Sequence, residues 1–204
     1  MISFETLDES DVSAAFDLAT ETFAQGSTLH RALGVGLDEY RAYLRPSFQQ
    51  MAEEGMSVIA RDGEGRLLGC LIVTEYRVED SSRLSPPFDA LAGLAKALDA
   101  QYRKACRVAA GDAVLVDMAA VALDARGMGL YGRMRREAES FALAKGYRLI
   151  LGELSSVATQ HFVLEKLGHK KRAEVMFDEF TYQGAKPFAG IKAPRSVILA
   201  EGEL

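Results

Sequence analysis

The sequence predicts a mixed α/β fold, and three observations carry that prediction. Segments with helical periodicity and segments of strand character both recur along the 204 residues, without internal repeats. The segment Ala113–Leu123 is almost uninterrupted in its apolar character, which is typical of a strand buried on both faces. The predicted strands and helices do not alternate regularly, so the sequence favours a mixed sheet over a doubly wound parallel one.

The first half of the chain predicts one strand, two helices and a hairpin. Alternation of apolar and polar residues indicates a strand, and apolar residues spaced by three and four indicate a helix. The turn Asp62-Gly63-Glu64-Gly65 has the composition of a hairpin loop. The expected elements are a strand at Ile2–Leu7, a helix with an N-cap among Asp8, Ser10 and Asp11 that runs through Phe23, a helix at about Leu37–Glu54, and hairpin strands at Met56–Arg61 and Arg66–Tyr76.

The second half predicts helices that alternate with strands and two strands at the end. Helix Leu130–Lys145 carries apolar residues on one face and is followed by Gly146, a natural helix-terminating residue. The expected elements are a polar linker at Ser81–Pro87, a helix at Phe88–Val108, a strand at Ala113–Leu123, a helix at about Leu130–Lys145, a strand at Arg148–Leu154, a helix at Thr159–Leu167, and strands at Val175–Tyr182 and Ser196–Glu201.

Composition excludes several classes of protein. With 24 Lys and Arg against 29 Asp and Glu, the net charge of −5 argues against nucleic acid or an anionic membrane as the main partner. The two cysteines, Cys70 and Cys106, show no zinc-ligand spacing and cannot form a disulfide scaffold, so we expect no metal. The N-terminus lacks the layout of a signal peptide, and no apolar run approaches the roughly 20 residues of a membrane span. We therefore expect a soluble cytoplasmic protein.

The glycine-containing segment Val121–Gly132, VALDARGMGLYG, lies between a predicted strand and a predicted helix. A helix N-terminus offers unpaired N–H donors, and glycines let a phosphate approach the backbone, so a pyrophosphate site is the natural expectation. A P-loop is excluded because no Lys-Ser/Thr pair follows the glycines. A dinucleotide site stays open: Gly127, Gly129 and Gly132 spell GxGxxG, and Glu153 follows about 20 residues on.

The same segment resembles the acyl-CoA loop of the GNAT N-acetyltransferase superfamily, V-x-x-x-x-R/Q-x-x-G-x-G/A, through Val121, Arg126 and Gly129. Gly168 before His169 is similar to the family's "klGF" ending, although His169 replaces the usual Phe. The segments 57–72 and 180–191, with the helix 88–108, resemble the arylalkylamine-type branch. In a second departure, Tyr131 stands where the loop pattern has Gly or Ala.

This resemblance implies one acetyltransferase domain over residues 1–204, with an acyl-CoA-binding core at about 113–170 and a mostly antiparallel central sheet flanked by helices. It implies acetyl-CoA as co-substrate. The pyrophosphate would be bound by the main-chain N–H groups of Gly127, Met128, Gly129, Leu130, Tyr131 and Gly132. The side chain of Arg126 would assist them. The opened backbone of the central strand would pair with the pantetheine arm at Met118, Ala119, Ala120 and Val121. Arg133 lies in the first turn of a helix, where the dipole disfavours cations and a bound polyphosphate would reverse that penalty.

Amine acetylation needs a base, because an amine with a pKa near 10.4 is mostly ammonium at pH 7. Asp117 is the first choice, a carboxylate within the apolar strand VLVDMAAVAL where the resemblance places a glutamate in the histone-modifying branch. Glu21 is the second, since the arylalkylamine branch carries a glutamate near it, although a direct alignment puts Ser27 there. The usual general-acid tyrosine is Leu164 here, with Ser155, Ser156 and His161 nearby.

We therefore expect an acetyl-CoA-dependent N-acetyltransferase that transfers acetyl directly to a primary amine in a ternary complex. The partner is a small-molecule amine, and the resemblance is compatible with a homodimer. Two other interpretations stay open: a catalytically silent acyl-CoA-binding module, and a dinucleotide-dependent oxidoreductase using Gly127, Gly129 and Gly132. Aromatic residues in three loops favour an apolar or aromatic acceptor; the loops are Gln25–Gly36, Tyr76–Phe88 and Gln183–Pro194, and the aromatics are Tyr76, Phe88, Tyr182 and Phe188.

Overall fold

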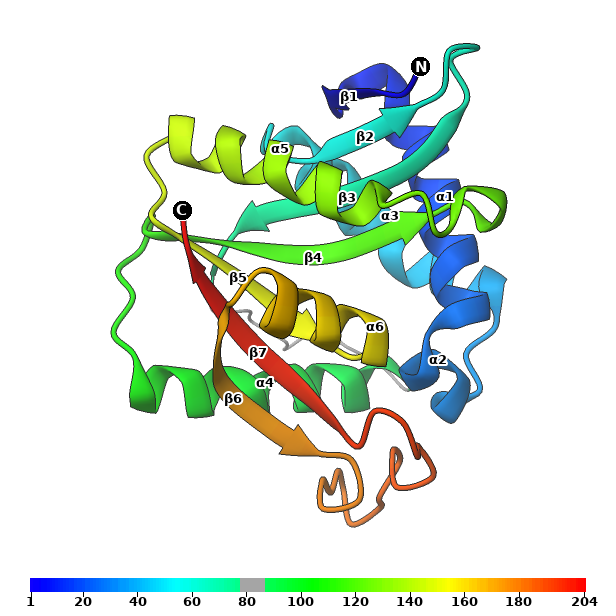
Figure 1. Ribbon diagram of the computed structural model, residues 1–204. Helices are drawn as coiled ribbons and strands as arrows, with labels where there is room; N and C mark the ends of the chain where they lie inside the picture. The colour runs from blue at the N-terminus through cyan, green and yellow to red at the C-terminus, as the bar shows by residue number, and fades with distance from the viewer. Residues whose placement is uncertain (78–86) are drawn as a thin grey trace.

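The computed structural model describes residues 1–77 and 87–204 and is built around a seven-stranded sheet in the order β1-β2-β3-β4-β5-β7-β6 (Figure 1). All neighbouring strands run antiparallel except β4 and β5, which are parallel. The strands are β1 Ser3–Thr6, β2 Val58–Arg61, β3 Leu67–Glu75, β4 Ala113–Val121, β5 Leu149–Leu154, β6 Lys170–Met176 and β7 Ser196–Glu203. This is the expected mixed, mostly antiparallel α/β fold.

Helices cover both faces of the sheet. The α-helices are α1 Val12–Gly26, α2 Thr28–Leu33, α3 Leu37–Glu53, α4 Phe88–Ala105, α5 Leu130–Ala144 and α6 Val157–Gln160. Short 3-10 helices η1 (Glu9–Asp11) and η2 (Leu123–Ala125) precede α1 and α5, and a π-helix, η3 (His161–Lys166), continues α6. In Figure 1, α5 and α6 lie in front of the sheet, whereas α4 passes behind it.

The core is divided between the two faces by the alternation of each strand. On β3, Ile72 packs in the cluster formed by α1 and α3, whereas Leu71 and Val73 pack in the cluster beneath α5. On β7, Val197 faces the cluster that contains α4, and Ile198 faces η3. We refer to the two sides as the α1/α4 face and the α5/α6 face.

The structure confirms the predicted order of elements and corrects several of them. The strand expected at Val175–Tyr182 is wrong, because the chain pairs with β7 over Lys170–Met176 and turns after Phe177. This edge strand begins with the charged residues Lys170, Lys171 and Arg172, and charged and apolar residues alternate only after them. The charged start hid the strand pattern in the sequence. Helix α2 was not expected; it begins at the N-cap Ser27, whose Oγ accepts a hydrogen bond from the backbone of His30.

Other corrections concern the ends of elements. The helix expected at Phe88–Val108 ends at Ala105, and the helix expected at Thr159–Leu167 is α6 followed by η3. The helix expected to end at Phe23 runs to Gly26. Of the expected linker Ser81–Pro87, residues 81–86 lie outside the described residues.

Two properties of the described ranges bear on function. None of their helices is long and apolar enough to cross a membrane. No group of three or more His, Cys, Asp or Glu side chains in residues 1–77 and 87–204 is arranged to hold a metal ion. Cys70 and Cys106 are free thiols.

Candidate active site

The parallel strands β4 and β5 part in the middle of the sheet. They pair from Ala113 with Leu149 to Val116 with Gly152, and there the ladder ends. Because β4 continues to Val121 and β5 to Leu154, the β5-facing backbone of residues 118–121 has no strand partner in the described part of the chain. Met118, Ala119, Ala120 and Val121 therefore lie where the backbones of the two strands diverge, and we call this place of divergence the β4–β5 cleft.

A β-bulge on β4 marks the start of the β4–β5 cleft. Met118 pairs with Ile72 and Val116 pairs with Val73, so that Asp117 is the extra residue. The bulge reverses the alternation of the strand: Val116 packs on the α5/α6 face, whereas Met118 packs on the α1/α4 face, two residues on. Asp117 therefore stands at the point where β4 leaves β5.

The Asp117 carboxylate is partly buried and hydrogen-bonded across the β3–β4 pair. Thr74 Oγ1 donates to Asp117 Oδ2 at 2.5 Å. Thr74 lies two residues beyond Ile72 on β3, so this pair belongs to the α1/α4 face, opposite α5. Asp117 and the unpaired backbone thus lie at the same point of the sheet.

The second candidate base, Glu21, lies on an exposed side of α1. Its carboxylate forms an ion pair of 3.3 Å with Arg41 of α3, which also binds Asp17 at 3.0 Å, and its side chain is 54% exposed. Ser27, the alternative position, caps α2 and contacts His30 Nδ1 at 2.8 Å. Arg41 thus neutralises part of the charge of the Glu21 carboxylate at the protein surface.

The loop between β4 and α5 has the conformation that its glycines permit. Gly127 and Gly129 have φ of +81° and +70°, in the left-handed region that other residues rarely adopt. Gly129 is the N-cap of α5 and provides no side-chain cap. The first-turn N–H groups of Leu130, Tyr131 and Gly132 therefore lack intrahelical acceptors, and Arg126 and Met128 are exposed beside them.

Tyr131, the departure from the GNAT loop pattern, packs against Phe162 of η3. The two rings meet edge to face with centroids 5.3 Å apart. A Cβ atom at Gly132 would lie 2.6 Å from Phe162 Cζ, so only glycine fits there. Burial raises the pKa of the Tyr131 hydroxyl. This aromatic pair joins the N-terminal turn of α5 to η3 on the α5/α6 face.

Other predicted residues have structural neighbours that the sequence did not indicate. The Arg133 guanidinium lies 4.3 Å from the centroid of the Phe4 ring in β1. Its contact with a polyphosphate stays a prediction. Leu164, at the usual position of the acid, packs with apolar neighbours on η3, whereas His161 is exposed. Ser156 caps α6 by accepting from Thr159 N at 3.1 Å.

The aromatic residues expected to select the acceptor mostly pack within the protein. Phe188 is fully buried, and Tyr182 packs on Gly93 of α4. Phe88 stacks on Tyr43 of α3 at 3.9 Å between centroids. Tyr76 donates a hydrogen bond to Asp99. These contacts assign no acceptor, and residues 78–86 of the expected Tyr76–Phe88 loop lie outside the described residues.

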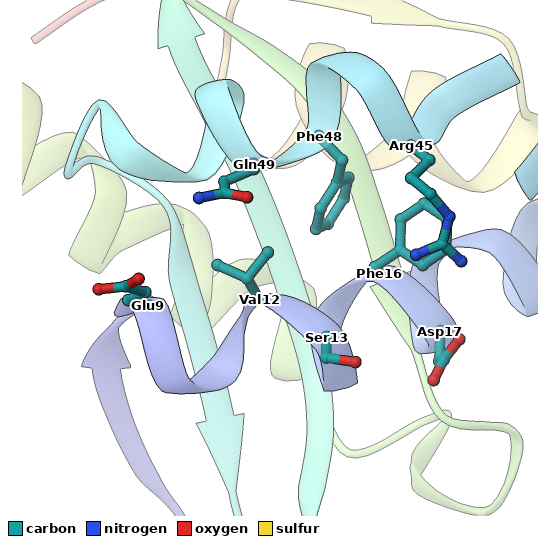
Figure 2. Close-up of a pocket in the computed structure, with 8 residues that line it drawn as sticks. All are labelled: Glu9, Val12, Ser13, Phe16, Asp17, Arg45, Phe48 and Gln49. Atoms are coloured by element: carbon teal, nitrogen blue, oxygen red, sulfur yellow. The ribbon is translucent and has the colours of Figure 1, made fainter. Parts of the chain in front are cut away.

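A separate surface groove of about 380 Å³ lies between α1 and α3 (Figure 2). Phe16 and Phe48 form its base, and Arg45 lies over the Phe16 ring at 4.6 Å from the centroid. None of the site residues predicted from the sequence is among the residues that line it. We therefore place the candidate active site at the β4–β5 cleft and not at this groove.

Comparison with solved structures identifies the fold. The C-terminal condensation domain of Ebony, solved with beta-alanyl-dopamine, superposes with a TM-score of 0.90 at 16% identity, covering 100% of this chain and 99% of that one. A putative arylalkylamine N-acetyltransferase 7 of the mosquito Aedes aegypti gives 0.85 at 17% identity, covering 99% and 87%. The polyamine N-acetyltransferase of Drosophila melanogaster gives 0.75 at 15% identity, covering 100% of both chains.

Sequence comparison adds no family assignment: no protein-family model and no curated protein sequence matches the chain. At 15–17% identity the structural likeness concerns the fold. The predicted resemblance is confirmed at that level, including the arylalkylamine-type neighbours. The chain has the fold of the GNAT N-acetyltransferases.

Proposed function

We propose that this protein is an acetyl-CoA-dependent N-acetyltransferase that acts on a small primary amine. The observation that carries the proposal is the parting of β4 from β5 at Val116 and Gly152, with the carboxylate of Asp117 at the same bulge. An open strand edge can bind an extended amide-containing arm, and a carboxylate beside it can remove a proton. The fold, shared with N-acetyltransferases, agrees with this chemistry.

The residues present suit an acyl-CoA. The uncapped first turn of α5, from Leu130 to Gly132, offers N–H donors and the positive end of the helix dipole to a pyrophosphate. Arg126, exposed in the same loop, adds a positive charge. The backbone of Met118–Val121 offers hydrogen bonds to the amides of the pantetheine arm. When bound, acetyl-CoA supplies an acetyl thioester, which is the electrophile.

Asp117 is the base of this proposal, acting directly or through one water. It takes a proton from the ammonium form of the acceptor, whose nitrogen then attacks the thioester carbonyl carbon in a ternary complex. Backbone N–H groups of the unpaired β4 segment stabilise the oxyanion. The nitrogen loses its second proton to the leaving thiolate or to solvent as the C–S bond breaks, and a thiolate whose conjugate acid has a pKa of about 8.5 can leave without a general acid. Leu164 at the usual tyrosine position is compatible with that.

The wider assignments of this proposal follow the resemblance. Residues 1–204 form one acetyltransferase domain with the acyl-CoA-binding core at about 113–170, and the protein works in the cytoplasm without a metal. Glu21 is a second candidate base. The sheet topology does not support the dinucleotide alternative, because a dinucleotide-binding fold has a mostly parallel sheet. Here β4 and β5 form the sole parallel pair among the described strands.

A second candidate function is transfer of an aminoacyl group to an arylalkylamine. It is favoured by the TM-score of 0.90 with a condensation domain whose bound molecule, beta-alanyl-dopamine, is an amide of an amino acid and an arylalkylamine. Both functions use the same base and the same attack on a thioester.

The experiment measures thiol release with two donors, acetyl-CoA and beta-alanyl-CoA, against dopamine, agmatine and a monoamine without an aromatic ring. We expect turnover with acetyl-CoA and one class of amine. Turnover with beta-alanyl-CoA alone favours the second function. Tight binding of acetyl-CoA without turnover for any amine identifies a silent binding module, and absence of binding to either thioester contradicts the proposal.

A further inference from the structure

Arg135 is a fully buried cation in the second turn of α5. Its side chain has 0% exposure, and it is among the largest fully buried side chains of the described residues. Arg135 and Glu139 have the i,i+4 spacing that is typical of an ion pair on a solvated helix face. The pair does form, with Nε donating to Glu139 Oε1 at 3.2 Å, but its arginine is buried.

One nitrogen of this guanidinium is left without a partner. Nη2 lies 3.5 Å from His169 Nδ1, and Nε binds Glu139, whereas the buried Nη1 has no hydrogen-bond partner among the described residues. A buried cationic N–H group without an acceptor costs more free energy than a neutral one, because the charge increases the desolvation penalty. Such a group calls for an acceptor that arrives with a ligand.

The free nitrogen lies at the start of the β4–β5 cleft. Nη1 is 3.7 Å from the position of a Cβ atom on Gly152, the last β5 residue that pairs with β4. Because Gly152 has no side chain, the guanidinium can lie against the strand. Beyond this residue the two strands separate, so Nη1 lies next to the place where the proposed thioester arm would enter the sheet.

The polar neighbours of the guanidinium are Glu139, His169 and Tyr131. Burial, and then Arg135 itself, lower the pKa of His169 to about 4, so His169 is uncharged near neutral pH. Glu139 is the carboxylate bound to Arg135 and is 27% exposed. The Tyr131 hydroxyl is hydrogen-bonded to Arg135, and the rings of Tyr131 and Phe162, which join α5 to η3, lie on the same side. A hydrogen bond formed in such a setting is stronger than one in water.

We propose that Arg135 is a substrate-binding residue that donates a hydrogen bond from Nη1 to an amide carbonyl oxygen of the pantetheine arm. The inference rests on the proposed function, because it needs a pantetheine thioester in the β4–β5 cleft. The expected ligand group is a neutral carbonyl of the arm, because Nη1 lies against Gly152 in the sheet.

The test compares two ligands and matched variants by calorimetric titration of the full-length protein. The ligands are acetyl-CoA and S-acetylpantetheine, which carries the same arm without phosphates. The variants are Arg135→Met and, as the control, Arg136→Met, the neighbouring exposed arginine on the same helix. Arg135→Met should weaken both ligands by the same factor, about 10-fold or more, and Arg136→Met should leave S-acetylpantetheine unchanged.

Three results decide the matter. Equal affinity of wild type and Arg135→Met for both ligands overturns the inference while leaving the proposed function intact. A loss with acetyl-CoA alone also overturns it, because it assigns Arg135 to a phosphate. If wild type binds neither ligand, the proposed function fails first and the inference with it. Should Arg135→Met not fold, Arg135→Lys, which keeps the charge but not the planar donor geometry, carries the same comparison.

Discussion

Thr74 on β3 donates a hydrogen bond of 2.5 Å to Asp117 at the bulge of β4, immediately before β4 separates from β5. The hydrogen bond fixes a carboxylate on the α1/α4 face, while the backbone of the next four residues lacks a β5 partner. A proton acceptor and an open strand edge are thereby held at one position by the pairing of three strands. The predictions below test this arrangement and the loop that follows it.

Replacement of Asp117 by Asn should lower kcat at pH 7 by about 10²–10⁴-fold, because the side chain still accepts from Thr74 but no longer takes a proton. The Kd for acetyl-CoA should barely change. The loss should shrink as the pH rises, since more of the acceptor amine is then deprotonated. Steady-state kinetics from pH 6 to 10 check this, with Glu21→Gln as the comparison. The larger loss identifies the base, and near-normal kcat in Asp117→Asn assigns that residue a structural role.

The variant Thr74→Val tests the hydrogen bond itself. Valine has nearly the shape of threonine but removes the donor, so we expect kcat to fall by about 10-fold as the carboxylate loses its fixed orientation. In the Asp117→Asn background the same change should cost little more, because the two residues act as one unit. Additive losses in the double variant would show that Thr74 acts independently of Asp117.

Acetyl-CoA alone should stabilise the protein. A ligand at 100 times its Kd adds about 2.7 kcal/mol, which for a chain of this size raises the melting midpoint by very roughly 5–10 °C. Differential scanning fluorimetry with acetyl-CoA, CoA and NADH provides the comparison. A shift of the melting midpoint with NADH and none with acetyl-CoA or CoA would support the dinucleotide alternative and contradict the proposed acetyltransferase function.

Gly129→Val separates a binding role of the glycine from a conformational one, and Gly34 offers a matched control. Gly129 (φ 70°, ψ 17°) and Gly34 (φ 69°, ψ 23°) share the left-handed conformation, and neither has a neighbour within 4 Å of an added Cβ. Each valine should cost about 1–3 kcal/mol of stability. Only Gly129→Val should also weaken acetyl-CoA by 10-fold or more, as measured by titration. Equal binding by both variants would make Gly129 purely structural.

Acid should destabilise the fold through buried histidine. Burial lowers the pKa of His30 to about 4 from an ordinary value of 6.5, so the unfolded chain binds the proton more readily. Its contribution to stability is complete above pH 6.5 and is lost as the pH falls towards 4, by at most about 1.4 kcal/mol per pH unit. Urea unfolding from pH 7 to 4.5 should give a shallower decline for His30→Leu than for wild type. Parallel declines would contradict this.

Local sequence patterns determined most of the elements and the place of the loop. The periodicity of Leu130–Ala144 and the apolar run at β4 depend on residues close in sequence, and such patterns predict helices and strands directly. Gly127 and Gly129 likewise signalled a backbone with positive φ. These signals sufficed for the fold class and for the resemblance that the solved structures confirmed.

Other features depended on partners distant in the chain. The position of β6 follows from its pairing with β7, because the sequence of an edge strand rich in charge does not reveal its register. Asp117 is visible in the sequence as a carboxylate in an apolar strand, but its place at a bulge exists only in the pairing with β3.

Arg135 shows the difference between sequence and structure most clearly. Its i,i+4 spacing from Glu139 is the same in a solvated helix as in a buried one, so the sequence gives no sign of which face is covered. Tertiary packing decided it: His169, 34 residues away, and Gly152 on β5 enclose the guanidinium and leave Nη1 without an acceptor. Burial is a property of surfaces that meet across the chain, and the sequence of one helix does not contain it.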